Sequence, residues 1–113
     1  MKAVSLNTLT ASASLFPQVA KNDLAQGDWV VLRTMKSVYT LKVLDGGLYE
    51  ATGGWFDKKG LAPVRIRVLG ATWGGSAIMP TVLAACGLRV EFQNRLITSP
   101  VQRIVVIRWW VGN

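Results

Sequence analysis

Histidine is absent from the 113-residue sequence, and cysteine occurs once, as Cys86. Histidine is the commonest general base and the commonest metal ligand in proteins, so its absence argues against the widespread hydrolytic mechanisms and against most metal sites. A single cysteine excludes a disulfide within the chain and is typical of a protein from a reducing compartment. We therefore expect neither a metal nor a cofactor.

Long apolar runs are also missing. No window reaches the ~18 apolar residues that a membrane-spanning helix needs. The Ser/Thr-rich segment that follows Met1 and Lys2 lacks the apolar core of a secretory signal. Together with the lone cysteine, these absences predict a cytoplasmic protein that has no membrane partner.

Acidic residues are scarce in this chain. Thirteen Lys and Arg outnumber six Asp and Glu, which gives a formal net charge of +7 at pH 7. A basic domain attracts anionic partners such as nucleic acid, acidic protein surfaces or anionic lipid. The alternative is that the charge only keeps the protein in solution, because the cations are not clustered in one run.

Two side chains have the chemistry of a nucleophile, Ser76 and Cys86. Residues 74–77 partly match a nucleophile elbow but lack its closing glycine and the histidine of a triad. Cys86 lies among small residues without a neighbouring base or cation, so we expect a buried, unreactive thiol. The six acids do not have the spacing of a metal loop or of a glycosidase pair. The sequence thus predicts a protein that is not an enzyme.

The length and the apolar content, which is half of all residues, predict a single domain over residues 1–113. For residues 1–15, a strand and a loose N-terminal arm both remain open. Short β segments separated by glycine-rich turns dominate the rest. They favour a mainly β fold of six to eight short strands with one or two short helices, built as a small SH3-like or OB-like barrel or as a compact sandwich.

Residues 88–107 carry the clearest β pattern. Alternation over 88–92 predicts a half-buried strand with its apolar residues inward and Arg89 and Glu91 outward. Residues 101–107 are almost continuously apolar, so they predict a central strand covered on both faces. Further strands are expected at 29–34, 37–44 and 64–68, and Asp45-Gly46-Gly47 predicts a hairpin turn.

Helices are expected in two short segments, each framed by proline and glycine. Residues 18–26 follow Pro17, and residues 80–86 begin at Pro80; a glycine follows each segment. Residues 55–60 are expected to form a loop.

Basic and aromatic side chains form the candidate binding site. Alternation places the arginines of 64–68 and of 88–92, and the lysine of 37–44, outward. Two lysines and an exposed tryptophan lie in the 55–60 loop. Binders of single-stranded nucleic acid combine such cations with stacking aromatic rings. We therefore expect a polyanion, nucleic acid above all, to bind a basic face made of Arg65, Arg67, Arg89, Lys42, Lys58, Lys59 and Trp55.

The C-terminal residues 101–111 form the most continuous apolar run in the chain. An uncovered, strand-prone edge recruits a second chain. We therefore predict a homo-oligomer whose interface contains Trp109, Trp110 and Val111. The alternative function is a protein-interaction or structural module that uses this tryptophan-rich strand, with the basic charge incidental.

Overall fold

A computed structural model of the chain describes residues 13–74 and 77–108. In this part of the chain the backbone forms short strands, one α-helix and two 3-10 turns. In chain order the elements are β1 (Ala13–Leu15), β2 (Gln18–Ala20), η1 (Lys21–Asp23), β3 (Trp29–Thr34), β4 (Val38–Val43), η2 (Asp45–Gly47), β5 (Tyr49–Gly53), α2 (Gly54–Lys58), β6 (Val64–Ile66), β7 (Val68–Thr72), β8 (Ile78–Met79), β9 (Val82–Ala85), β10 (Arg89–Phe92) and β11 (Val101–Ile107).

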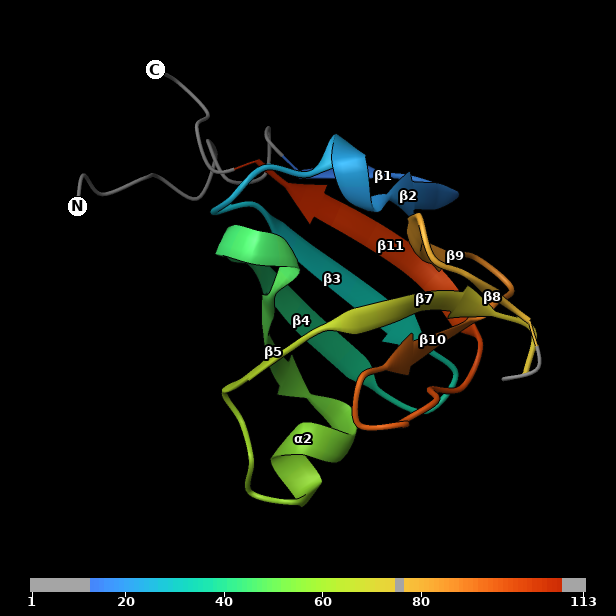
Figure 1. Cartoon of the computed structure of the whole chain (residues 1–113). Helices are drawn as coiled ribbons and strands as arrows, with labels where there is room; N and C mark the ends of the chain where they lie inside the picture. Colours follow the sequence, from blue (N-terminus) through green and yellow to red (C-terminus); the bar gives the residue numbers. More distant parts are fainter. Residues whose placement is uncertain (1–12, 75–76, 109–113) are drawn as a thin grey trace.

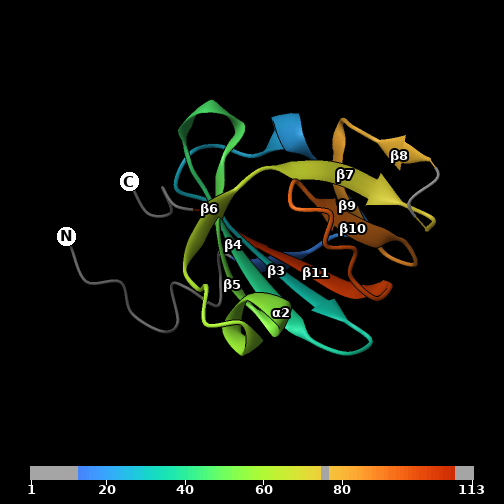
Figure 2. The same ribbon diagram turned by 60° about the horizontal axis from the view of Figure 1, so that its bottom comes forward.

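The strands form three antiparallel sheets (Figure 1). The largest has the order β1-β11-β3-β4-β5-β6, the second is β10-β7-β8, and the third is β2-β9. β7 crosses one face of the large sheet, and β8, β9 and β10 lie on that same side (Figure 2). Since β9 also contacts β7, β10 and β11, the two small sheets together form a second layer.

The described residues therefore form a sandwich-like, mainly β fold, and their sheets do not close into a barrel. The predicted fold class is confirmed, and the sandwich is the correct one of its two architectures. The strand number is higher than the predicted six to eight, because eleven strands are present in the described residues. Several of the extra strands have only two or three residues, too few for a readable alternation.

The core lies between the two layers. Alternation in β3 and β4 works as predicted, since Leu32, Tyr39 and Leu41 are all buried. An aromatic cluster fills one end of the core: the ring centroids of Phe56 and Phe92 are 5.1 Å apart, and that of Tyr39 lies 6.0 Å from each. Phe56 is the buried residue of α2, so this one ring anchors the helix over the end of the sandwich.

Glycines end the strands where the chain must reverse. Gly46 and Gly47 have φ of +69° and +79° and join β4 to β5, which confirms the predicted hairpin. Gly53 ends β5 with φ +93°, and a Cβ there would overlap the carbonyl of Val38. A positive φ and a close backbone approach are both conditions that glycine meets without strain.

Both predicted helices are wrong. Residues 18–26 contain β2 and η1, and residues 80–86 contain β9. The reason is tertiary: β2 and β9 pair with each other, with Val19 opposite Ala84, although they are distant in the sequence. The predicted loop at 55–60 instead contains most of α2, whose hydrogen bonds include Lys59 N–H to the Trp55 carbonyl at 3.0 Å.

Three predictions of burial are also corrected. The face of β11 that carries Val105 and Ile107 is only half-buried, because the second layer covers one face of the large sheet. Glu91 is buried rather than outward, since a bridge to Ile97 continues the sheet past β10. Cys86 is exposed, because β9 ends one residue earlier and the thiol lies in the following turn.

Candidate functional site

The seven predicted site residues lie on several different elements. Lys42 and Arg65 lie on the outer face of the large sheet, Arg67 lies in the link from β6 to β7, Arg89 lies on β10, and Trp55, Lys58 and Lys59 lie on α2 or directly after it.

The burial predicted for these residues is largely confirmed. Arg65 and Arg67 are exposed, and Ile66 between them is buried. Arg89 is only half-buried, with a guanidinium nitrogen that donates to the Thr98 carbonyl at 3.3 Å. Trp55 is half-buried rather than exposed, because its ring packs against Phe56 and the core.

One row of side chains on the outer face of the large sheet is balanced in charge. The strand register places Trp29 beside Lys42, Lys42 beside Glu50, and Glu50 beside Arg65. The charges therefore alternate in sign across three strands, which is favourable between cross-strand neighbours. The Lys42 ammonium also lies 5.6 Å from the ring centroid of Trp29, within the range of a cation–π contact.

A second row on the same outer face, nearer to α2, is not balanced. Arg103 of β11 lies beside Arg33 of β3, which lies beside Val38 of β4. Both arginines are exposed, and the neighbour that completes the row is apolar. Like charges directly opposite each other destabilise a sheet. An anion bound between the two arginines would relieve this repulsion.

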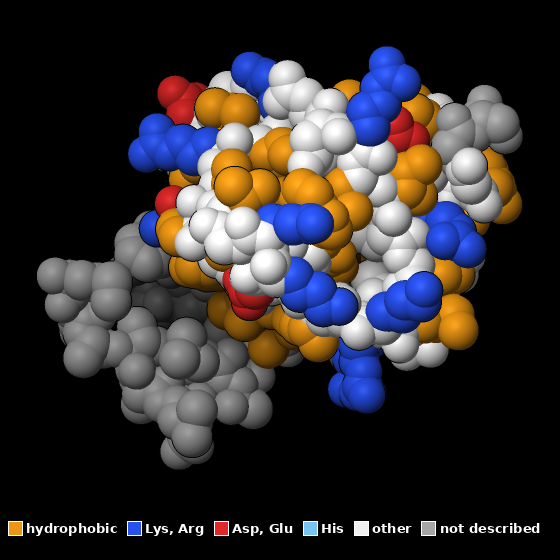
Figure 3. Space-filling model, turned by 90° about the horizontal axis from the view of Figure 1, so that it is seen from below, with side chains coloured by type: hydrophobic (Ala, Val, Ile, Leu, Met, Phe, Trp, Pro, Cys, Tyr) orange, Lys and Arg blue, Asp and Glu red, His pale blue; other side chains and the backbone are white. Residues whose placement is uncertain are grey.

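Three more cations lie at this end of the sheet. Lys36 lies in the β3–β4 connection, and Lys58 and Lys59 lie at the end of α2; all three are exposed. The β3–β4 connection and α2 project from the same end of the molecule in Figures 1 and 2. Viewed from that end, Lys and Arg side chains surround apolar and neutral surface (Figure 3). We refer to this surface as the α2 end, made of Arg33, Lys36, Lys58, Lys59 and Arg103.

Acidic side chains hardly compensate the α2 end. Of the six acids, all of which are described, only Asp57 lies on its elements. The Asp57 carboxylate accepts a hydrogen bond from the Gly53 N–H at 2.9 Å, so it serves to fix the start of α2. The elements of the α2 end therefore carry five cations and one acid among the described residues.

Four of the other described cations, Lys21, Arg67, Arg89 and Arg108, donate hydrogen bonds within the fold, whereas Arg65 and Arg95 make none among the described residues. Arg67 donates to the Gly46 carbonyl at 2.7 Å, and Arg108 forms an ion pair with the buried Asp28 at 3.0 Å. The Lys21 ammonium donates to the Val68 carbonyl at 2.6 Å, and burial lowers the pKa of that ammonium. In contrast, the side chains of the five α2-end cations make no hydrogen bond or ion pair within residues 13–74 and 77–108.

Sequence reasoning missed Arg33, Lys36 and Arg103. Alternation in β3, where Leu32 is buried, is a signal that would have placed Arg33 outward. The juxtaposition of Arg33 and Arg103 depends on the pairing of β3 with β11, and no local pattern encodes that pairing. A bulge between Val101 and Arg103 shifts the register by one residue and further hides the relationship.

The predicted oligomer interface, Trp109, Trp110 and Val111, lies outside the described residues. Oligomerisation therefore stays a prediction. In the described part of the chain, no cluster of three or more His, Cys, Asp or Glu is placed to hold a metal ion. None of the helices described there has the length and the apolar content needed to cross a membrane.

No protein-family model, curated protein or solved structure matches the chain. Its class is therefore defined by fold and surface alone: a sandwich-like β domain with one cationic end whose Lys and Arg side chains have no partner among the described residues.

Proposed function

We propose that this protein is a non-enzymatic module that binds a polyanion, nucleic acid, through its α2 end. The observation that carries the proposal is the clustering at one end of the molecule of five exposed cations that have no partner among the described residues. Arg33, Lys36, Lys58, Lys59 and Arg103 make no side-chain hydrogen bond or ion pair within residues 13–74 and 77–108, whereas Arg67 and Arg108 are hydrogen-bonded within the fold. Side chains without internal partners are the ones that remain free to contact phosphates.

The neighbouring arginines favour nucleic acid over a simple role in solubility. Arg33 and Arg103 occupy adjacent strands, which lie about 4.8 Å apart in a sheet. A role in solubility gives no reason to place two arginines directly opposite each other on paired strands. A guanidinium is, moreover, the side-chain group best matched to phosphate, because its planar fork donates two parallel hydrogen bonds.

The surface supports binding that is largely independent of base sequence. The tryptophan of α2, Trp55, is half-buried and packs on the core, which limits the ring surface available for stacking. The available contacts are therefore mainly electrostatic contacts between Lys or Arg side chains and the phosphates of the nucleic acid. Affinity of that kind is modest, with a Kd of roughly 1–100 µM at physiological salt, and falls steeply as salt rises.

Fluorescence anisotropy with a labelled oligonucleotide of about 16 nucleotides tests the proposal. Affinity should fall as NaCl is raised from about 50 to 200 mM, and the double variant Lys58→Gln/Lys59→Gln should lower the salt slope by about 2. The matched control is Lys42→Gln/Arg65→Gln, which removes the same charge from the balanced row. Equal losses in the two double variants, or binding that is insensitive to salt, would contradict the proposal.

Two further predictions accompany the proposal without bearing on the α2 end. One is a homo-oligomer through Trp109, Trp110 and Val111, with the alternative that this segment makes the functional protein contact. Light scattering on the intact chain and on a chain that ends at Arg108 tests the homo-oligomer, and a monomer in both cases would contradict it. The other is a cytoplasmic location, which fractionation of the source cell would check.

A further inference from the structure

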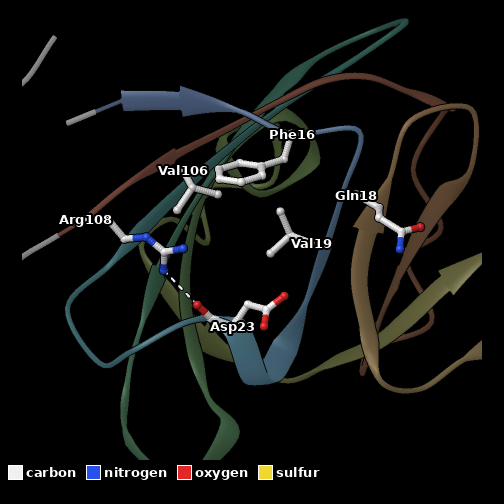
Figure 4. Close-up of a pocket in the computed structure, with 6 residues that line it drawn as sticks. All are labelled: Phe16, Gln18, Val19, Asp23, Val106 and Arg108. Atoms are coloured by element: carbon white, nitrogen blue, oxygen red, sulfur yellow. Dashed lines mark hydrogen bonds between the residues drawn. The ribbon is translucent and has the colours of Figure 1, made fainter. Parts of the chain in front are cut away.

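A pocket at the opposite end of the molecule contains a fixed arginine. It has a volume of about 280 Å³ and lies between β1, β2, η1 and the end of β11 (Figure 4). Its lining residues are Phe16, Gln18, Val19, Asp23, Val106 and Arg108. None of them belongs to the α2 end, so the pocket is independent of the proposed nucleic-acid surface.

Arg108 is held in place from behind by a buried carboxylate. Its Nη1 donates to Asp28 Oδ2 at 3.0 Å and to the Asp23 carbonyl at 2.7 Å. Asp28 is fully buried, and its Oδ2 also accepts the Ala25 N–H at 2.9 Å. The guanidinium is thus pre-oriented through one nitrogen.

The Nε and Nη2 donors of Arg108 make no hydrogen bond in the described part of the chain. Two parallel donors of this kind match the two oxygens of a carboxylate.

The remaining lining supplies an apolar floor and a negative group. Val19 and Val106 are buried, and the Phe16 ring lies beside them. The carboxylate of Asp23 points away from the Arg108 guanidinium, toward the side of the pocket where Val19 lies (Figure 4). This carboxylate is exposed and makes no hydrogen bond or ion pair among the described residues. The pocket therefore offers a cation, an anion and an apolar surface within one small volume.

We propose that this pocket binds a free α-amino acid with an aliphatic side chain. The ligand carboxylate pairs with the Nε and Nη2 donors of Arg108, the ligand ammonium faces the Asp23 carboxylate, and the side chain lies on Val19 and Val106. The volume of about 280 Å³ lies just below the range of about 300–1,000 Å³ typical of pockets for drug-sized molecules, so it has room for a free amino acid. Small pockets of this type use a few placed polar groups for orientation and apolar contacts for the rest.

Three ligands test the carboxylate contact and the ammonium contact separately. L-leucine carries both charges, N-acetyl-L-leucine lacks the ammonium, and L-leucinamide lacks the carboxylate. We expect methyl NMR signals of Val19 and Val106 to shift on titration with leucine up to about 10 mM, tenfold above a Kd of about 1 mM. N-acetyl-leucine should bind several-fold more weakly, and leucinamide should cause no saturable shift.

Two variants assign the contacts to residues. Arg108→Lys keeps the charge but loses the fork, and should weaken leucine binding at least about tenfold. Asp23→Asn should weaken leucine binding about fivefold without changing the affinity for N-acetyl-leucine. Because Asp23 is exposed, this second variant stays folded and keeps the test valid even if Arg108→Lys unfolds. Absence of a saturable shift with leucine, equal binding of leucinamide, or an unchanged affinity in Asp23→Asn would overturn the proposal.

Discussion

The two rows of charged side chains on the outer face of the large sheet differ in one respect. In the row of Lys42, Glu50 and Arg65 the sign alternates from strand to strand, whereas Arg33 and Arg103 stand side by side with the same sign. In the first arrangement the neighbouring charges attract each other, which stabilises the fold. The second costs stability unless an anion is bound. Charge therefore serves the fold in one row and is available to a partner in the other.

The largest expected effect comes from removing the residue on which α2 rests. Phe56→Ala deletes a ring with no exposed surface that contacts Tyr39 and Phe92, so we expect a loss of about 3–5 kcal/mol in the free energy of unfolding. Urea denaturation measures it, with Trp73→Ala as the control because Trp73 is 64% exposed. A loss below about 1 kcal/mol would mean that α2 is not anchored by this ring.

The next effect concerns a cation that has a buried partner. Arg108→Gln leaves the Asp28 carboxylate buried without its ion pair, and we expect a loss of about 2–3 kcal/mol in unfolding free energy, less than for a fully buried pair because Arg108 is partly exposed. Arg65→Gln, which removes an exposed cation, should change it by less than about 0.5 kcal/mol. Similar losses of unfolding free energy in the two variants would mean that the ion pair with Asp28 does not make Arg108 more important to the fold than an exposed cation.

A charge reversal in each row gives a smaller effect with opposite signs. Arg33→Glu replaces a like-charge pair by an opposite-charge pair, so it should stabilise the fold by about 0.2–1 kcal/mol. Lys42→Glu places a second acid directly opposite Glu50 and should destabilise the fold by a similar amount. Chemical denaturation at low salt measures both changes. If both charge reversals destabilise the protein, the proximity of Arg33 and Arg103 does not cost stability.

The same pair of variants links stability to binding. If the arginine pair is kept for an anion, Arg33→Glu should weaken oligonucleotide binding while it stabilises the protein. Lys42→Glu should leave binding much closer to that of the parent protein. A variant that gained both stability and affinity would show that the arginine pair has no part in the contact.

The smallest effect concerns alkaline pH. Burial raises the pKa of the Tyr49 phenol above its ordinary value of 10.0. Because the folded pKa lies above the unfolded one, the stability linked to the neutral phenol is fully present below pH 10.0 and is lost as pH rises through the folded pKa. Tyr49→Phe should therefore lose less stability than the parent protein above pH 10.0.

Urea denaturation of both proteins at neutral and alkaline pH measures this difference. The lowered pKa of Lys21 acts in the opposite direction, since the folded state then disfavours the charged amine. It is common to both proteins, so it cancels in the comparison. Parallel stability curves would show that the folded Tyr49 phenol ionises at the ordinary pKa.

Local patterns predicted the fold class and the inner faces of the longer strands, because alternation is imposed residue by residue. Leu32, Leu41 and Ile66 are buried for this reason. The helices predicted near Pro17 and Pro80 were wrong because β2 and β9 obtain their structure from each other. The juxtaposition of Arg33 and Arg103 was missed for the same reason, because these neighbours are 70 positions apart in the sequence.

The position of β11 between β1 and β3 has a consequence for how the chain folds. The ribosome releases β3, β4 and β5 early, and these can pair as a meander. The strand that joins them to β1 emerges last among the described elements. Pairing segments so distant requires loop closure before any contact compensates for it, so folding is slow. We therefore expect the nascent chain to expose the β3 edge that pairs with β11 until β11 has left the ribosome, which makes that edge a natural substrate for chaperones.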